Sequence, residues 1–284
     1  MNERNFINFK AVALTPETIR SRAPSIFAEG PMSGVSGRYT FVPTARIMGG
    51  LQELAWMPVE VEEQRIRREA RRGFQKHLIR FRRADQMETL DEWNVELVLL
   101  NSHDGASAYQ LHAGIYRRIC SNGMVVANES FEAIRFRHAG LDPDEVVQSS
   151  RLIVESIPRL GQCVQRMRER ILDSRESLEL SANALLLRYP DLEAAPVHPE
   201  TLLKSRRPED EGVDLWRTFN RLQENLTRGG VADGRRNMRG KLRSVRALRG
   251  IDSMVTVNKG IWGLAEHLLT GQTLPAAETV AFPV

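Results

Sequence analysis

Four side chains in one stretch of the sequence could together carry out nucleophilic or acid–base chemistry. His103 and Asp104 are neighbours in the segment Asn101–Gly105, and His112 and Cys120 follow in the same stretch. A catalytic cysteine needs a histidine that helps to form the thiolate, and a histidine can also serve as a general base. If a hairpin brings these four side chains together, the sequence predicts a small catalytic site.

The same residues also fit an ordinary structural role. Asn101–Gly105 is rich in turn-forming residues, and Asp104 and Gly105 would take positive φ angles in a hairpin turn. A cysteine at the end of a strand often behaves as a small buried apolar side chain. Because the histidines and cysteines match no standard zinc spacing, we expect neither a metal nor a cofactor.

A different chemistry is indicated by basic side chains in residues 65–83, which contain nine Arg or Lys and a single acid, Glu69. Such crowding of like charge is unfavourable unless an anion neutralises it, and a nucleic-acid backbone is an anion of many charges. In an extended strand, Lys76, Arg80 and Arg82 would lie on one face at intervals of roughly 6.6 Å. That interval is close to the phosphate spacing of an extended single strand.

The second basic run, residues 235–249, holds seven Arg or Lys and no acid. Its glycines weaken it as an isolated helix, so one interpretation is a flexible arm that becomes ordered on a polyanion. The other interpretation is an amphipathic helix whose apolar face is formed by Leu242, Val245 and Leu248. Both interpretations leave the arginines exposed.

Together the two runs predict a nucleic-acid-binding protein without enzymatic activity, for which single-stranded DNA is the favoured ligand. The alternative for the first run is a solvated surface whose charges pair with Glu60, Glu62 and Glu63. The residues expected to hold phosphates are Arg65, Arg67, Arg68, Arg71, Arg72, Lys76, Arg80, Arg82, Arg239, Lys241 and Arg243.

The elements that position these side chains in the first half are predicted from alternation and turn chemistry. Thr44 is expected to cap a helix that ends before Pro58, and residues 59–72 fit either a strand or a helix. Strands are expected at residues 38–42, 76–83, 95–100, 109–119 and 131–136.

After Leu141 the periodicity becomes helical. A helix is expected to begin at Pro143 and to be interrupted by Pro158, with a second helix running to about Tyr189. Further helices are expected after Asp214 and from Met254 to Leu269, and residues 190–213 read as a linker or long surface loop. The sequence therefore predicts an α+β fold: a small antiparallel β-sheet packed on helices at 1–141, then a mainly α-helical region at 142–284.

Composition places the chain among ordinary soluble proteins. It has 284 residues, of which 42% are hydrophobic, and a formal net charge of +4. No run of about 18 apolar residues could span a bilayer, the N-terminus lacks the apolar stretch of a signal peptide, and the two cysteines form no disulfide framework. We expect a cytoplasmic protein that does not associate with membranes.

Several segments together resemble a known but uncharacterised phage/plasmid-like family, the domain of unknown function 932. The resemblance extends over most of the chain. It is carried by the segments Ala23–Ala28, Arg38–Thr44, Lys76–Arg82, Glu96–Gly105, Ile119–Val126, Trp216–Asn225 and Asn258–Glu266.

The resemblance implies a protein typical of prophages, plasmids and other mobile elements, often encoded beside antirestriction and DNA-repair genes, and it implies no agreed activity. Phage single-strand annealing proteins, which pack a small antiparallel sheet on a helix and act as ring oligomers, offer a fold-level analogy. An annealing role in recombination would therefore also imply a homo-oligomer. Two alternatives stay open: a protein that binds and counters a host defence factor, and a nucleic-acid-processing enzyme that uses His103, Asp104, His112 and Cys120.

Overall fold

The computed structural model describes residues 12–66, 68–87, 93–117, 123–126, 134–136, 138, 140, 142–272 and 274. The chain divides into two compact units, Met1–Ser156 and Ile157–Val284. The first contains an antiparallel sheet with helices packed on it and the second is mainly helical, as the sequence predicts. No helix among the described residues is both long and apolar enough to cross a membrane.

The sheet of the first unit has the strand order β1-β2-β3-β4-β5, and β6 also pairs with β4, along residues 109–111, whereas β5 pairs with residues 113–116. Neighbouring strands are antiparallel. Every residue of β3 from Asn94 to Asn101 is buried, which explains its nearly continuous apolar sequence. The strands are β1 (Trp56–Glu63), β2 (His77–Arg83), β3 (Trp93–Asn101), β4 (Tyr109–Arg117), β5 (Gly123–Val126) and β6 (Ile134–Phe136).

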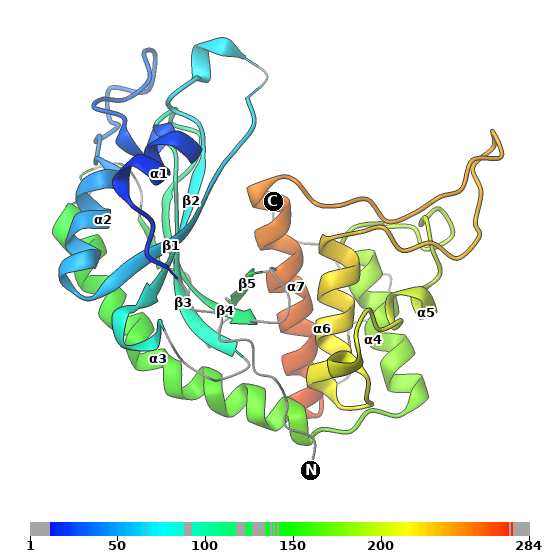
Figure 1. The fold of residues 1–284 in the computed structure, drawn as a ribbon. Helices are drawn as coiled ribbons and strands as arrows, with labels where there is room; N and C mark the ends of the chain where they lie inside the picture. Colours follow the sequence, from blue (N-terminus) through cyan, green and yellow to red (C-terminus); the bar gives the residue numbers. More distant parts are fainter. Residues whose placement is uncertain are drawn as a thin grey trace. The chain divides into compact units, whose positions relative to one another are not determined.

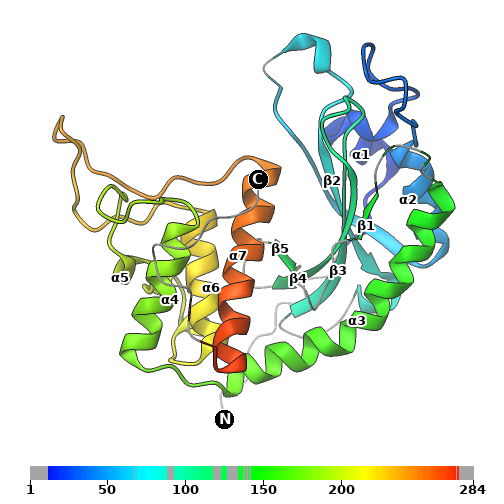
Figure 2. The ribbon, with the colours of Figure 1, turned by 180° about the vertical axis from the view of Figure 1, so that it is seen from behind.

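Three helices lie on one side of this sheet: α1 (Pro16–Arg22), α2 (Thr44–Glu53) and the beginning of α3 (Pro143–Glu169) (Figures 1 and 2). The buried face of α2 consists of Thr44, Ile47, Met48 and Leu51. The backbones of α2 and α3 approach closely at Gly50, where an added Cβ would lie 2.8 Å from a methyl carbon of Val147. The sheet and these helices therefore enclose the core of the first unit.

Two predictions for the first unit are wrong in detail. Residues 38–42 form no strand, and Thr44 is the first residue of α2 rather than its cap, a position that Pro43 takes. The Thr44 hydroxyl is instead used in the interior, as described below. Residues 59–72 resolve into the end of β1 followed by a loop with a one-turn 3-10 helix, η2 (Glu69–Arg71).

The expected break at Pro158 is absent, because α3 continues through this proline to Glu169. Proline removes one helical hydrogen bond, but apolar side chains at helical spacing on both sides of it are buried and stabilise the continuous helix: Ile153, Leu160, Val164 and Met167. The helix ends instead at Glu169, and after residues 170–172 Asp173 caps α4 (Ser174–Leu186) through a capping box with Glu176.

The second unit packs α4 beside α6 (Leu215–Thr227) and α7 (Ile251–Thr270) (Figure 1). Asp214 caps α6, which begins directly after it as the sequence predicts, and Gly271 ends α7 in the left-handed conformation. Residues 190–213, expected as a linker or long loop, contain α5 (Pro199–Leu202) and the one-turn 3-10 helix η4 (Pro208–Asp210) and bury Ala195 and Val197. They are part of this unit's packing.

Candidate nucleic-acid interface

The β1–β2 loop, residues 64–76, carries several of the cations that were predicted to hold phosphates. Arg65, Arg68, Arg71 and Arg72 are exposed, and Lys76 is half-buried at the end of the loop. Arg72 pairs with Glu69, and Arg71 lies 3.5 Å from the Asp104 carboxylate. Arg67 lies outside the described residues.

Two of the acids expected to pair with this loop, Glu60 and Glu63, make other contacts. Glu60 pairs with Arg22 at 3.3 Å, and Glu63 accepts hydrogen bonds from the Ser25 amide and the Gln75 side chain at 2.8 and 2.7 Å. Exposed surface pairs such as Arg72 with Glu69 are weak and leave the guanidinium accessible. The loop therefore keeps an excess of exposed positive charge.

Arg80 and Arg82 do lie on one face of β2, but they are not available to a ligand. Their side chains are 11% and 5% exposed, and both donate to the buried carboxylate of Glu96, at 2.6 and 2.7 Å. Both guanidinium groups also lie over the ring of Tyr116. Because this internal acid already satisfies them, we leave Arg80 and Arg82 out of the interface.

The second basic run is not a helix. Residues 229–249, which we call the basic arm, form two extended segments that run antiparallel and meet at a tip (Figure 1). Four backbone hydrogen bonds join them: Gly230 N to Val245 O at 2.7 Å, Val245 N to Val231 O at 3.0 Å, Arg243 N to Arg235 O at 2.8 Å, and Asn237 N to Lys241 O at 2.9 Å. The interpretation as an amphipathic helix is wrong, because Leu242 is exposed while Val245 packs inward.

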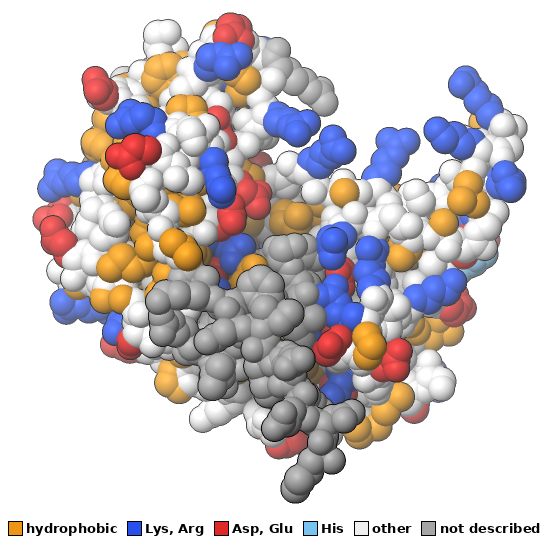
Figure 3. Space-filling model, in the orientation of Figure 1, with side chains coloured by type: hydrophobic (Ala, Val, Ile, Leu, Met, Phe, Trp, Pro, Cys, Tyr) orange, Lys and Arg blue, Asp and Glu red, His pale blue; other side chains and the backbone are white. Residues whose placement is uncertain are grey.

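The arm exposes a row of cations without acidic partners. Figure 3 shows Lys and Arg side chains spaced along this projecting segment. No ion pair among the described residues involves a basic side chain of residues 235–249. The exposed cations are Arg236, Arg239, Lys241, Arg246 and Arg249.

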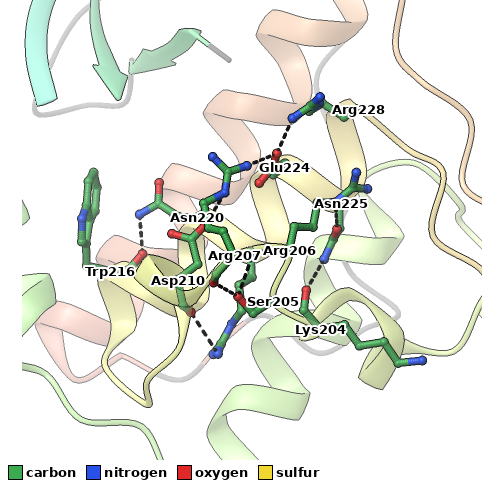
Figure 4. Close-up of polar contacts among 11 residues, drawn as sticks. Lys204, Ser205, Arg206, Arg207, Asp210, Trp216, Asn220, Glu224, Asn225 and Arg228 are labelled. Atoms are coloured by element: carbon green, nitrogen blue, oxygen red, sulfur yellow. Dashed lines mark hydrogen bonds and ion pairs between the residues drawn. The ribbon is translucent and has the colours of Figure 1, made fainter. Parts of the chain in front are cut away.

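The base of the arm is held by a buried polar network on α6 (Figure 4). The Glu224 side chain is 3% exposed and accepts from Arg207 and, at 2.7 Å, from Arg228. The Asn225 amide oxygen accepts from Arg206 Nε at 2.6 Å, and Arg206 also donates to the carbonyl of Gly229. The first segment of the arm is thereby fixed to the end of α6.

The second segment of the arm is fixed to the same place. Arg188 of the α4 end donates to the carbonyl of Leu226 in α6 and to that of Arg246 in the arm, the latter at 2.8 Å. The amide of Leu248 donates to the carbonyl of Thr227 at 2.8 Å. Sequence reasoning did not single out Arg188, Arg206, Glu224 or Asn225 for this role. The available signal was the unusual density of polar residues on a helix that also carries a complete apolar face.

Glycine is required where the two segments part. Gly229 has φ +66°, and a Cβ built on it would lie 2.5 Å from backbone atoms of Val245, Arg246 and Ala247. A side chain there would push the returning segment away. The close approach at Gly229 therefore sets the position of the arm on α6.

The four side chains proposed as a catalytic site are not brought together. Asn101 is paired with His77 across β2 and β3, whereas His112 is paired with Val98, three residues earlier on β3. Side chains alternate between faces, so His112 lies on the opposite face from the His77–Asn101 pair. Cys120 lies outside the described residues. The geometry gives no support to catalysis by this set.

Asp104 has a structural role in the β3–β4 connection, residues 102–108. Its carboxylate accepts from the Ser102 hydroxyl at 2.7 Å and from the Ala106 amide at 3.0 Å. Gly105 has φ +73°, but Asp104 has a negative φ, so the expected two-residue hairpin turn is replaced by a longer loop. The predicted turn is therefore present, but it is not of the predicted two-residue type.

His103 belongs to a buried group that we call the Thr44 cluster: Ser25, Thr44, His77, Asn101 and His103. The Thr44 hydroxyl lies 2.9 Å from His77 Nε2 and 3.1 Å from His103 Nε2, and it accepts from the Asn101 amide at 3.0 Å. A hydroxyl donates once and accepts twice. His77 Nδ1 lies 2.8 Å from the Ser25 hydroxyl and 3.2 Å from the carbonyl of Gln75, which can only accept. We therefore assign the proton of His77 to Nδ1, so that His77 Nε2 accepts from Thr44 and His103 Nε2 donates to Thr44.

This arrangement keeps both histidines neutral. Burial, together with the neighbouring His103, lowers the pKa of His77 to about 3. Burial, with His138 nearby, lowers the pKa of His103 to about 4 although Asp104 acts in the opposite direction. A general base that operates near neutral pH needs a pKa close to neutral, and the pKa values of both histidines lie well below it. We therefore assign the Thr44 cluster a structural role, in which its hydrogen bonds fix α2 on the sheet.

Among the described residues, no three His, Cys, Asp or Glu side chains are grouped so that they could hold a metal ion.

Comparisons with known proteins place the chain among uncharacterised relatives. Residues 31–262 match the family described as "Domain of unknown function (DUF932)". Two proteins of Escherichia coli (strain K12), "UPF0380 protein YafZ" and "UPF0380 protein YfjQ", are each 36% identical to it over 257 residues, which is 90% of this chain and 92% of each relative. No solved structure matches. The resemblance found in the sequence is confirmed: the chain belongs to the DUF932 family.

Proposed function

We propose that this protein binds nucleic acid through the exposed cations of the basic arm, with the β1–β2 loop as a second contact region. The observation that carries the proposal is the row of arm cations that have no acidic partner among the described residues. Unpaired exposed cations along an extended segment match the regular charges of a phosphate backbone. The proposed activity is binding, without a chemical step.

The strand preference expected from the sequence is not part of this proposal. It depended on Arg80 and Arg82 as phosphate ligands on an open sheet face, and both are buried against Glu96. The exposed arm cations do not replace that face, because they lie on two antiparallel segments and on the turn that joins them, not on one face of a sheet strand. Annealing of single strands is therefore no longer the favoured activity.

The proposal makes a quantitative prediction about salt. If the five exposed arm cations each neutralise one phosphate, the logarithm of the association constant should fall against the logarithm of salt concentration with a slope near −4.5 on duplex, or near −3.5 on a single strand. Specific protein–protein contacts rarely show so steep a dependence. The slope therefore reports whether phosphates are the ligand.

The test is a salt titration of fluorescence anisotropy with the full chain, using a labelled single strand and its duplex. The arm variant replaces Arg239, Lys241 and Arg246 by Ala. These side chains have no hydrogen bond or ion pair recorded among the described residues, so the fold should be unchanged. On duplex, the slope should become shallower by about 2.7.

A matched control removes the same charge elsewhere. Arg151, Arg159 and Arg175 are exposed on α3 and α4, and their replacement by Ala also lowers the net charge by three. This control should bind with an almost unchanged slope. Absence of binding by the natural chain at about 50 mM salt, or equal losses in the arm and control variants, would overturn the proposal.

A further inference from the structure

We propose that the tip of the basic arm enters the minor groove of a duplex, where Met238 wedges between two base pairs and kinks the helix. This inference rests on the proposed nucleic-acid binding and adds a ligand form, a groove and a mechanical consequence. It is carried by the shape of the arm, by the exposure of one apolar side chain, and by the residue types that the arm lacks.

The arm has the shape of a narrow two-stranded ribbon, a form that nucleic-acid-binding proteins place in the major or the minor groove, and its exposed apolar tip favours the minor groove. Its tip, Asn237–Gly240, is ordered by the Asn237 side chain, whose amide oxygen accepts from the Arg239 and Lys241 amides at 2.9 and 3.0 Å. Arg236 donates to the Gly240 carbonyl at 2.7 Å and closes the turn from the other side. The tip is therefore shaped before any ligand arrives.

Met238 stands at the end of this ribbon with a relative exposure of 107%, so it touches almost nothing in its own protein. A fully exposed methionine between arginines contributes nothing to the described core. Groove-binding proteins use apolar side chains of this kind, methionine among them, to unstack adjacent base pairs from the minor groove. The cations on either side would hold the two phosphate backbones while the apolar end enters the stack.

The residue types of the arm favour a duplex over a single strand. Proteins that hold single strands stack unpaired bases on aromatic rings, and residues 229–249 contain no Phe, Tyr, Trp or His. The fixed base of the arm, where Arg188 and Arg206 bind its two segments, also resists displacement when the wedge enters. Flexible pyrimidine–purine steps should be preferred, because they unstack most easily.

The experiment measures the end-to-end distance of a short duplex that carries a donor dye and an acceptor dye, by energy transfer, with and without the full chain. The natural protein should shorten this distance, as a kink of tens of degrees requires. Met238→Ser should abolish the shortening and keep the salt slope of binding, because no phosphate contact is removed. Met238→Leu should retain the shortening.

Leu242→Ser is the matched control. Leu242 is the other exposed large apolar side chain of the arm among the described residues, is 51% exposed, and lies in the bridge with Arg236 beside the turn rather than at its end, so its replacement should leave the bend intact. Binding without a change of distance, or equal bending by Met238→Ser, would overturn the wedge and leave the proposed function standing. Absence of binding by the natural chain would overturn both, and a preference for the single strand would overturn the wedge alone.

Discussion

Lowering the pH from about 7.5 to about 5 should strongly destabilise the first unit, because the Thr44 cluster excludes protonated histidine. The pKa of His77 is lowered to about 3 and that of His103 to about 4, from an unfolded value near 6.5. Between these values the unfolded chain binds more protons than the folded chain. The stability that these histidines confer is complete above pH 6.5 and is lost progressively as the pH falls toward 4.

The magnitude follows from the size of the shift. A solution at pH 5 is about 1.5 pH units below the pKa of an unfolded imidazole, and each unit corresponds to about 1.36 kcal/mol. Each of the two buried histidines should therefore lower the free energy of unfolding by about 2 kcal/mol, or about 4 kcal/mol together. The pKa of His138 is also lowered by burial and acts with the same sign. This is a large share of the stability of an ordinary domain.

Two carboxyl groups act in the opposite direction. Burial raises the pKa of Glu62 in the first unit, and it raises the pKa of Glu266 in the second unit to about 7, so these carboxyls take up a proton more readily in the folded state and favour folding as the pH falls. The measurement is therefore best made in a Glu266→Gln background that also carries Glu62→Gln. The free energy of unfolding would be determined by urea titration at several pH values, and the histidine ring signals would be followed by NMR.

Either of two results would refute the reasoning. A free energy of unfolding that stays level between pH 6.5 and 5 in the background with both substitutions would show that no buried histidine opposes protonation. Ring signals of His77 and His103 that titrate near pH 6.5 in the folded protein would show that the Thr44 cluster admits the charged form.

Three further changes have defined outcomes. Gly229→Ala should destabilise the protein by about 1–3 kcal/mol, because the new Cβ meets the returning backbone at Val245. Thermal unfolding would check this prediction, and an unchanged melting temperature would contradict it. Glu224→Gln should lower the free energy of unfolding by about 1–3 kcal/mol, because it removes the charged acceptor shared by Arg207 and Arg228, while Arg207 keeps its ion pair with Asp210; urea titration would check this, and an unchanged free energy of unfolding would contradict it. Ala55→Gly should raise the free energy of unfolding by about 0.5–1 kcal/mol, because Ala55 holds φ +63°; a loss of stability in urea would show that this conformation carries no strain.

The elements of the first unit could be predicted largely from local patterns. Alternation identified β2, and the apolar run with its following turn residues identified β3 and the connection to β4. The strand expected at residues 38–42 is absent: the Thr40 amide donates to the carbonyl of His138, but no strand ladder forms there among the described residues, and a period of two cannot reveal whether a pairing partner exists. Periodicity therefore located β2, β3, β4 and β6, left the end of β1 open between strand and helix, missed β5, and added a strand at residues 38–42 that does not form.

The candidate site was harder to predict, because it depends on contacts between distant residues. Arg80 and Arg82 looked like surface cations until strand register placed Glu96 beside them. The basic arm was recognised by its charge and its glycines, but its antiparallel form depends on backbone bonds such as Arg243 to Arg235. Nothing in local sequence shows that Arg206 reaches Gly229 across the end of α6. Charge composition therefore located the arm, but it did not reveal the contacts that hold the base of the arm.

The attachment of the arm also has a mechanical meaning. A ribbon clamped at one end and free at the other behaves as a cantilever, so a load at its tip produces its largest moment at the clamp. Here the clamp is the last turn of α6, and the Asn225 amide there also donates to the carbonyls of Leu202 and Lys204 at 2.8 and 2.9 Å. Force applied far out on the arm is thus delivered to the junction of α5 and α6, inside the helical unit, rather than dissipated in a loose hinge.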